Sequence, residues 1–179
     1  QTFYNSGLKS ISIPNSVTNI RDSAFNSCIY LTQVVLPKNL LSINQYVFNN
    51  CLELKKIDLP SSIQSIGDRA FSGCAKLTNI ELPSKLTYIG RNVFSNCDSL
   101  TKVITPIAGT VFSNIFGTNV EDLEFCAGDT IPDNYLKGYS NLVSLKIPSS
   151  VTKIGTYAFS ACNNLQNIEY SDGLQTIKQ

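Results

Sequence analysis

Residues 54–76 read LKKIDLPSSIQSIGDRAFSGCAK, and this 23-residue unit recurs along most of the chain. The leucine at position 1 of the unit returns as Leu8, Leu31, Leu54, Leu77 and Leu100. A unit this short cannot enclose a hydrophobic core alone, so it must bury its apolar face against copies of itself. The sequence therefore predicts a single repeat solenoid over residues 1–179.

Each unit predicts one short strand and one turn region. Positions 3 to 6 alternate polar and apolar, which is typical of a half-buried strand, and a proline at position 7 stops strand pairing. Glycine is frequent at position 14 (Gly67, Gly90, Gly155), which predicts a backbone with positive φ there. The closing A-F-x-x-C segment has helical spacing and predicts a short helical or 3₁₀ turn on the opposite side.

The coils are regular over residues 8–99 and 142–164 and irregular over residues 100–141. In the first irregular coil, Val111–Asn114 matches Val93–Asn96, which puts Ile115 at the cysteine phase. In the second, Cys126 takes the proline position and Tyr139 the cysteine position. Drift under relaxed packing demands and a distinct presented feature both remain open for this region.

Composition narrows the class of protein. The 179 residues carry a net charge of +1 with no Lys/Arg run, which argues against nucleic-acid binding. No apolar stretch approaches the roughly 20 residues that a membrane helix needs, so we expect no membrane insertion by this segment. The chain has no Met, and both ends are partial coils without polar caps, so we expect a fragment of a longer protein.

The pattern L-x-x-I-x-[IL]-P-x-x-[VIL]-x-x-I-x-x-x-A-F-x-x-C resembles the BspA-like, treponemal-type leucine-rich repeat over nearly the whole chain. The resemblance implies a right-handed leucine-rich-repeat stack with a concave parallel β-sheet. It also implies a cell-surface or secreted protein associated with adhesion to host, matrix or microbial surface proteins. The family offers no catalytic residues to transfer, and residues 100–141 depart from its pattern.

Five cysteines share one phase of the repeat: Cys28, Cys51, Cys74, Cys97 and Cys162. Stacked strands would place them about 4.8 Å apart in a column that points into the core. We favour a buried thiol ladder, because free cysteine behaves as a small hydrophobic residue. Disulfides between neighbouring coils stay open, whereas a metal site lacks the closely spaced ligand pairs that zinc requires.

Catalytic chemistry has little support. Without His, a nucleophile would need a Lys or carboxylate base. Asp58 and Glu81 should be neighbours, but nothing in the sequence predicts a desolvated cleft around them. Glu121, Asp122 and Glu124 form the densest acidic cluster, yet one short strand cannot supply the six to eight oxygens of a calcium site. We predict no enzyme, no metal and no cofactor.

What remains is the outward face of the strands, where positions 3 and 5 vary while the core positions stay fixed. Val35 and Ile104 are apolar residues in this polar strip and are candidate contact anchors. Tyr30, Tyr46, Tyr88 and Tyr157 could anchor a contact on the flank instead. The candidate protein-contact surface comprises Val35, Lys56, Asp58, Glu81, Lys102, Ile104, Asp122, Glu124 and Lys146.

We therefore predict a non-catalytic protein-binding or adhesion module that presents a rigid surface. Stacked strands hold many side chains at fixed spacing, so little ordering entropy is lost when a partner docks. The alternative is a structural spacer or intracellular scaffold whose activity lies outside this segment. The sequence leaves the ligand and the oligomeric state open.

Overall fold

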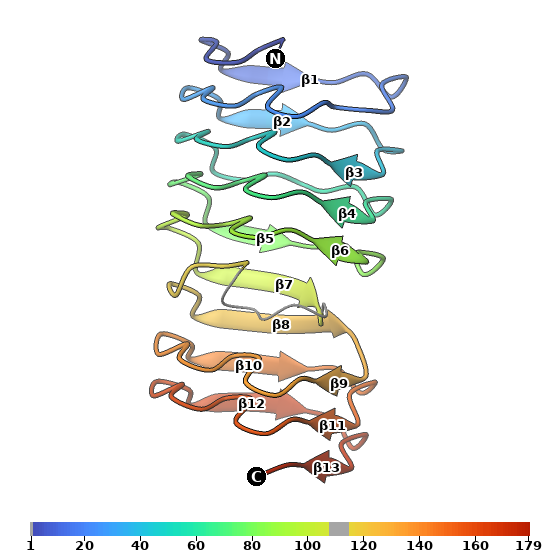
Figure 1. The fold of residues 1–179 in the computed structure, drawn as a ribbon, viewed down its shortest axis with the longest axis vertical. Helices are drawn as coiled ribbons and strands as arrows, with labels where there is room; N and C mark the ends of the chain where they lie inside the picture. Colours follow the sequence, from blue (N-terminus) through green and yellow to red (C-terminus); the bar gives the residue numbers. More distant parts are fainter. Residues whose placement is uncertain (1, 108–114) are drawn as a thin grey trace.

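The computed structural model describes residues 2–107 and 115–179, which form a parallel β-solenoid of stacked coils (Figure 1). The coils follow one another along the long axis, with the N-terminus at one end of the stack and the C-terminus at the other. The predicted repeat solenoid is confirmed, and every strand pair is parallel.

One strand from each coil except the third, which has none at this place, forms what we call the front strip. Along the strands at residues 33–35 and 79–81, for example, a buried residue lies between two exposed ones, as the period-2 pattern predicted. The strip is a two-stranded sheet, β1-β2, and a five-stranded sheet in the order β12-β10-β8-β7-β5. Its strands are β1 (Ser10–Ser12), β2 (Gln33–Val35), β5 (Asn79–Glu81), β7 (Lys102–Pro106), β8 (Asp122–Ala127), β10 (Ser144–Ile147) and β12 (Asn167–Tyr170).

A second strip of short strands runs beside the front strip (Figure 1). It consists of two three-stranded sheets, β3-β4-β6 and β13-β11-β9. Each strand carries the second apolar residue of the unit, such as Ile43 and Ile66, which are fully buried. Its strands are β3 (Ser42–Ile43), β4 (Ser65–Ile66), β6 (Tyr88–Ile89), β9 (Thr130–Ile131), β11 (Lys153–Ile154) and β13 (Thr176–Ile177).

The core is one continuous column of like residues. The position-1 residues Leu31, Leu54 and Leu77 are completely buried. The phenylalanines of successive coils stack face to face, with ring centroids 5.0–5.5 Å apart and nearly parallel planes. The stack runs through Phe3, Phe25, Phe48, Phe71, Phe94 and Phe116. Offset aromatic stacking adds to the stabilisation that burial itself provides.

The buried thiol ladder is confirmed for the four coils of residues 8–99, where Cys28, Cys51, Cys74 and Cys97 are buried and free, whereas Cys162 is free but only partly buried. Each thiol donates a hydrogen bond to the phenylalanine carbonyl of the preceding coil. Cys51 Sγ, for example, lies 3.3 Å from the carbonyl oxygen of Phe25, and Cys74 Sγ lies 3.2 Å from that of Phe48. Cysteine therefore combines an apolar surface with the donor that a buried carbonyl needs.

The irregular sixth coil keeps this hydrogen bond with a different residue. Tyr139 occupies the cysteine phase, is buried, and donates its hydroxyl to the carbonyl oxygen of Phe116 at 3.1 Å. In the next coil Cys162 resumes the role, with its Sγ 3.1 Å from the carbonyl oxygen of Leu136. The tyrosine that replaces cysteine at this phase therefore still donates a hydrogen bond to a backbone carbonyl of the preceding coil.

The predicted helical or 3₁₀ turn is wrong within the described residues, because the A-F-x-x-C segments form successive turns and no helix. Two residues in each regular coil adopt the left-handed conformation and so prevent a helix from forming. In the third coil they are Arg69, with φ of 53°, and Gly73, with φ of 78°. The A-F-x-x-C spacing buries alanine, phenylalanine and cysteine through a chain of turns instead.

The role predicted for the position-14 glycines is also wrong. Positive φ occurs at other positions, and Gly67, Gly90 and Gly155 need to be glycine for a different reason. A Cβ on Gly90 would lie 2.5 Å from the backbone nitrogen of Asp68, and one on Gly155 would lie 2.5 Å from that of Asp133. Any side chain here would push neighbouring coils apart, so these glycines permit close stacking.

The predicted alignment of the first irregular coil is wrong as well. Val111–Asn114 lies outside the described residues, but Phe116 forms a bridge with Phe94 and stacks on its ring at 5.0 Å. Ile115 therefore aligns with Val93 and not with the cysteine phase. Relative to the fourth coil, this coil is one residue shorter between Pro106 and Phe116 and two residues shorter between Phe116 and Val120.

Candidate protein-binding face

The five-stranded sheet of the front strip holds two parallel columns of outward side chains in register. One column joins position 3 of each coil and the other joins position 5. Between them lie the position-4 residues, which point inward and are buried in β5, β7, β8 and β10. The position-3 column is Asn79, Lys102, Asp122, Ser144 and Asn167, and the position-5 column is Glu81, Ile104, Glu124, Lys146 and Glu169.

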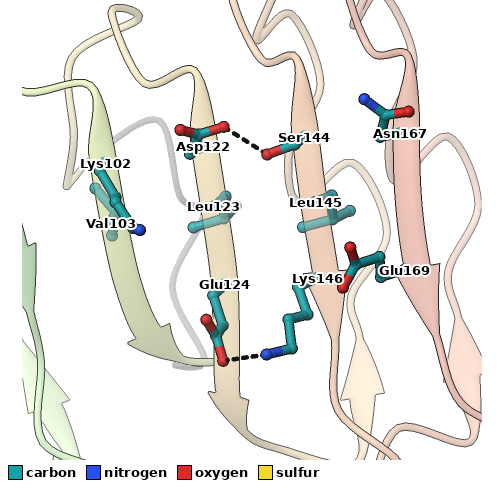
Figure 2. A pocket seen from close by; sticks show the side chains of 10 residues that line it. All are labelled: Lys102, Val103, Asp122, Leu123, Glu124, Ser144, Leu145, Lys146, Asn167 and Glu169. Atoms are coloured by element: carbon teal, nitrogen blue, oxygen red, sulfur yellow. Dashed lines mark hydrogen bonds and ion pairs between the residues drawn. The ribbon is translucent and has the colours of Figure 1, made fainter.

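A shallow groove of about 270 Å³ runs between the two columns across β7, β8, β10 and β12 (Figure 2). Its floor is formed by Val103, Leu123 and Leu145. Ser144 donates a hydrogen bond from Oγ to Asp122 Oδ1 at 2.5 Å on one side. On the other side, Lys146 Nζ lies 3.1 Å from Glu124 Oε1.

Six of the nine residues predicted for the contact surface lie on this one sheet: Glu81, Lys102, Ile104, Asp122, Glu124 and Lys146. Val35 lies on the separate β1-β2 sheet and is half exposed, as predicted. Ile104 was predicted to be exposed but is only partly so, because it lies between Glu81 and Glu124 in its column. Val35 is therefore the better apolar anchor of the two.

Lys56 and Asp58 occupy the third coil, where the front segment forms no strand between β2 and β5. Their side chains form an exposed ion pair with Lys56 Nζ 2.9 Å from Asp58 Oδ1, which contributes little to stability. Asp58 and Glu81 line one hollow of about 650 Å³ beside this segment, in agreement with the predicted proximity. Both carboxylates are exposed, so the hollow lacks the desolvation that a catalytic acid requires.

Cys126 is a residue of this face that the sequence reasoning left out. The register of β7 with β8 shifts between Thr105 and Pro106, which pair with Phe125 and Ala127, so Cys126 has no partner in β7. This bulge leaves the Cys126 side chain exposed at the edge of the hollow that Asp58 and Glu81 line. The sequence did contain one signal of this exposure, because Cys126 does not lie at the cysteine phase of the repeat.

Desolvation shifts the pKa values of Cys51, Cys74 and Cys126 in the same direction. Burial raises the pKa values of Cys51 and Cys74 far above the usual thiol range, so both remain protonated at neutral pH. Partial desolvation also raises the pKa of Cys126, with added repulsion from Glu81 and Glu124. None of these three has the lowered pKa that activates a nucleophilic cysteine.

The flank tyrosines lie as predicted, with one exception. Tyr30, Tyr88 and Tyr157 are exposed, whereas Tyr46 is partly buried.

Within residues 2–107 and 115–179, no group of three or more His, Cys, Asp or Glu residues could hold a metal ion. The same ranges contain no helix of the length and hydropathy needed to cross a bilayer.

Comparisons with known proteins agree with this architecture. The BspA type leucine rich repeat region matches residues 1–123 and 129–179, in six copies. No curated protein matches the sequence.

Two solved structures are similar to the chain. A leucine-rich repeat protein of T. pallidum is 29% identical with a TM-score of 0.61, and the match covers 92% of this chain and 68% of that one. A leucine-rich repeat protein from Bacteroides ovatus is 24% identical with a TM-score of 0.59, covering 94% of this chain and 56% of that one. With the repeat matched over nearly its whole length, the chain belongs to the BspA-type leucine-rich repeat family.

Proposed function

We propose that this chain is a non-catalytic protein-binding or adhesion module and that its binding surface is the front strip, centred on the sheet from β5 to β12. The observation that carries the proposal is the in-register pairing of five strands, which fixes two columns of varied side chains above a buried floor. A surface already ordered in this way loses little conformational entropy when a partner docks.

A location at the cell surface or in the secreted fraction is part of the same proposal. Membership of a family associated with surface adhesion supports it. The partner would then be a host, matrix or microbial surface protein. Neither the +1 net charge nor the mixed charges of the face favour nucleic acid.

The test replaces one serine in the centre of the face and one elsewhere. Binding to a panel of purified matrix and microbial surface proteins is measured for the wild type, Ser144→Tyr and Ser140→Tyr. Ser144 lies in the groove, whereas Ser140 is exposed in the turn before β10. The bulky ring at position 144 should obstruct the groove, so we expect Kd to rise at least tenfold, about 1.4 kcal/mol, for Ser144→Tyr and less than twofold for Ser140→Tyr.

Cys126 provides an independent readout of the same binding event. A partner docked on the front strip should slow alkylation of the exposed Cys126 thiol, because the thiol lies at the edge of that face. Equal affinities of the two tyrosine variants together with unchanged Cys126 alkylation would contradict a front-strip site. No binding to any protein in the panel would favour the second function, a structural spacer or intracellular scaffold.

A further inference from the structure

We propose that the groove across β7, β8, β10 and β12 binds an extended segment of a partner protein that carries an arginine or lysine side chain. The cationic group would lie above Leu145, between the carboxylates of Asp122 and Glu169. This inference rests on the proposed function and deepens it by naming the chemistry of the partner at one site.

The charges that line the groove are the first argument. They are three carboxylates, Asp122, Glu124 and Glu169, against two lysines, Lys102 and Lys146. Lys146 pairs with Glu124, and Lys102 lies opposite Asp122 in the ladder without an ion pair among the described residues. The groove therefore has one carboxylate more than it has lysines.

The positions of the two open carboxylates are the second argument. Ser144 binds only one oxygen of Asp122. Glu169 lies opposite Lys146 in the ladder of β10 with β12, but it makes no ion pair or side-chain hydrogen bond within the described part of the chain. Figure 2 shows Glu169 on β12 pointing toward β10, with Leu145 between it and the Asp122–Ser144 pair. A guanidinium placed there would have acceptors on both sides, which matches its forked donor geometry.

The shape of the groove indicates an extended segment. It crosses four adjacent strands, and three intervals of about 4.8 Å give a length of roughly 14 Å. About four residues of extended chain span that distance. The apolar floor also limits access of water from below, so ion pairs formed in the groove are screened less than those on an open surface.

The probes are four libraries of capped octapeptides with random flanking residues and a fixed central arginine, lysine, citrulline or glutamate. Citrulline has nearly the shape of arginine but no charge. We expect the arginine library to bind the wild type at least fivefold more tightly than the citrulline library, measured by fluorescence anisotropy. That preference should fall as salt is raised.

Two substitutions test whether the preference for arginine arises in the groove. Glu169→Gln should remove most of the preference for arginine over citrulline, whereas the matched control Glu53→Gln should leave it unchanged, because Glu53 pairs with Lys76 outside the groove. Equal binding of the arginine and citrulline libraries, or equal effects of the two Gln variants, would overturn the inference. Such a result would leave the proposed front-strip function intact if Ser144→Tyr still weakened binding of a protein partner.

Discussion

Replacing Phe71 with alanine is expected to lower the free energy of unfolding by about 3–5 kcal/mol. Phe71 is completely buried, and its ring stacks on Phe48 at 5.5 Å and on Phe94 at 5.3 Å. The substitution leaves a cavity in the middle of the stack and removes two aromatic contacts. Neighbouring coils cannot close the cavity easily, because hydrogen bonds on both sides of Phe71 fix their spacing.

Phe159 supplies the matched control for this measurement. It occupies the same phase in the seventh coil but is only partly buried, so Phe159→Ala should cost clearly less than Phe71→Ala. Urea denaturation followed by circular dichroism measures both variants. A loss below about 1 kcal/mol for Phe71→Ala would mean that the phenylalanine stack is not a close-packed core.

Alkaline pH is expected to destabilise the protein by about 3 kcal/mol between pH 8.5 and 10. Burial raises the pKa values of Cys51 and Cys74 in the folded chain, whereas an unfolded thiol ionises near pH 8.5. The folded state therefore holds these two protons after the unfolded state has released its own. Stability is then fully present below about pH 8.5 and falls as pH rises, by up to about 1.4 kcal/mol per pH unit for each thiol.

The slope of stability against pH, measured by urea denaturation with a reductant present, tests this expectation. Cys74→Ser retains a donor for the carbonyl of Phe48 but does not titrate in this range, so it should reduce the slope by about half. Cys126→Ser should change the slope far less, because that thiol is exposed. A flat profile to pH 10 would show that Cys51 and Cys74 ionise freely in the folded protein.

The regular coils were predictable because each core position repeats the same chemistry. Leucine, isoleucine, phenylalanine and cysteine at fixed phases determine which residues are buried, and Leu54 and Phe71 lie as expected. The second strip was not predicted as a sheet. Its strands are two residues long, and two residues such as Ser65 and Ile66 are too few for an alternation to be recognised.

The errors over the position-14 glycines and over Ile115 share a cause, which is that local sequence does not specify contacts between coils. Gly90 reads equally well as a turn residue or as a point of close approach, and only the position of Asp68 in the preceding coil distinguishes the two. Ile115 was misplaced because V-F-S-N at residues 111–114 resembles residues 93–96, whereas the ring of Phe116 is the one that stacks on Phe94.

The sequence predicted which residues lie on the candidate face, but it did not predict the hydrogen bond and the ion pair between them. Position within the repeat was sufficient to place Lys102, Asp122 and Lys146 on the outward side. The bond from Ser144 to Asp122 and the pair of Lys146 with Glu124 depend on side-chain conformations across strands, which spacing does not determine. The exposure of Cys126 depends on a one-residue bulge between β7 and β8.

Thiol accessibility is the most direct test of the claim that the coils share one water-free core. The native protein is alkylated at pH 7.5, and the modified cysteines are identified by mass spectrometry over time. We predict that Cys126 is modified first, that the partly buried Cys162 is modified more slowly, and that Cys28, Cys51, Cys74 and Cys97 are modified only after unfolding in guanidinium. Modification of those four at the rate of Cys126 in the native protein would contradict the stacked architecture.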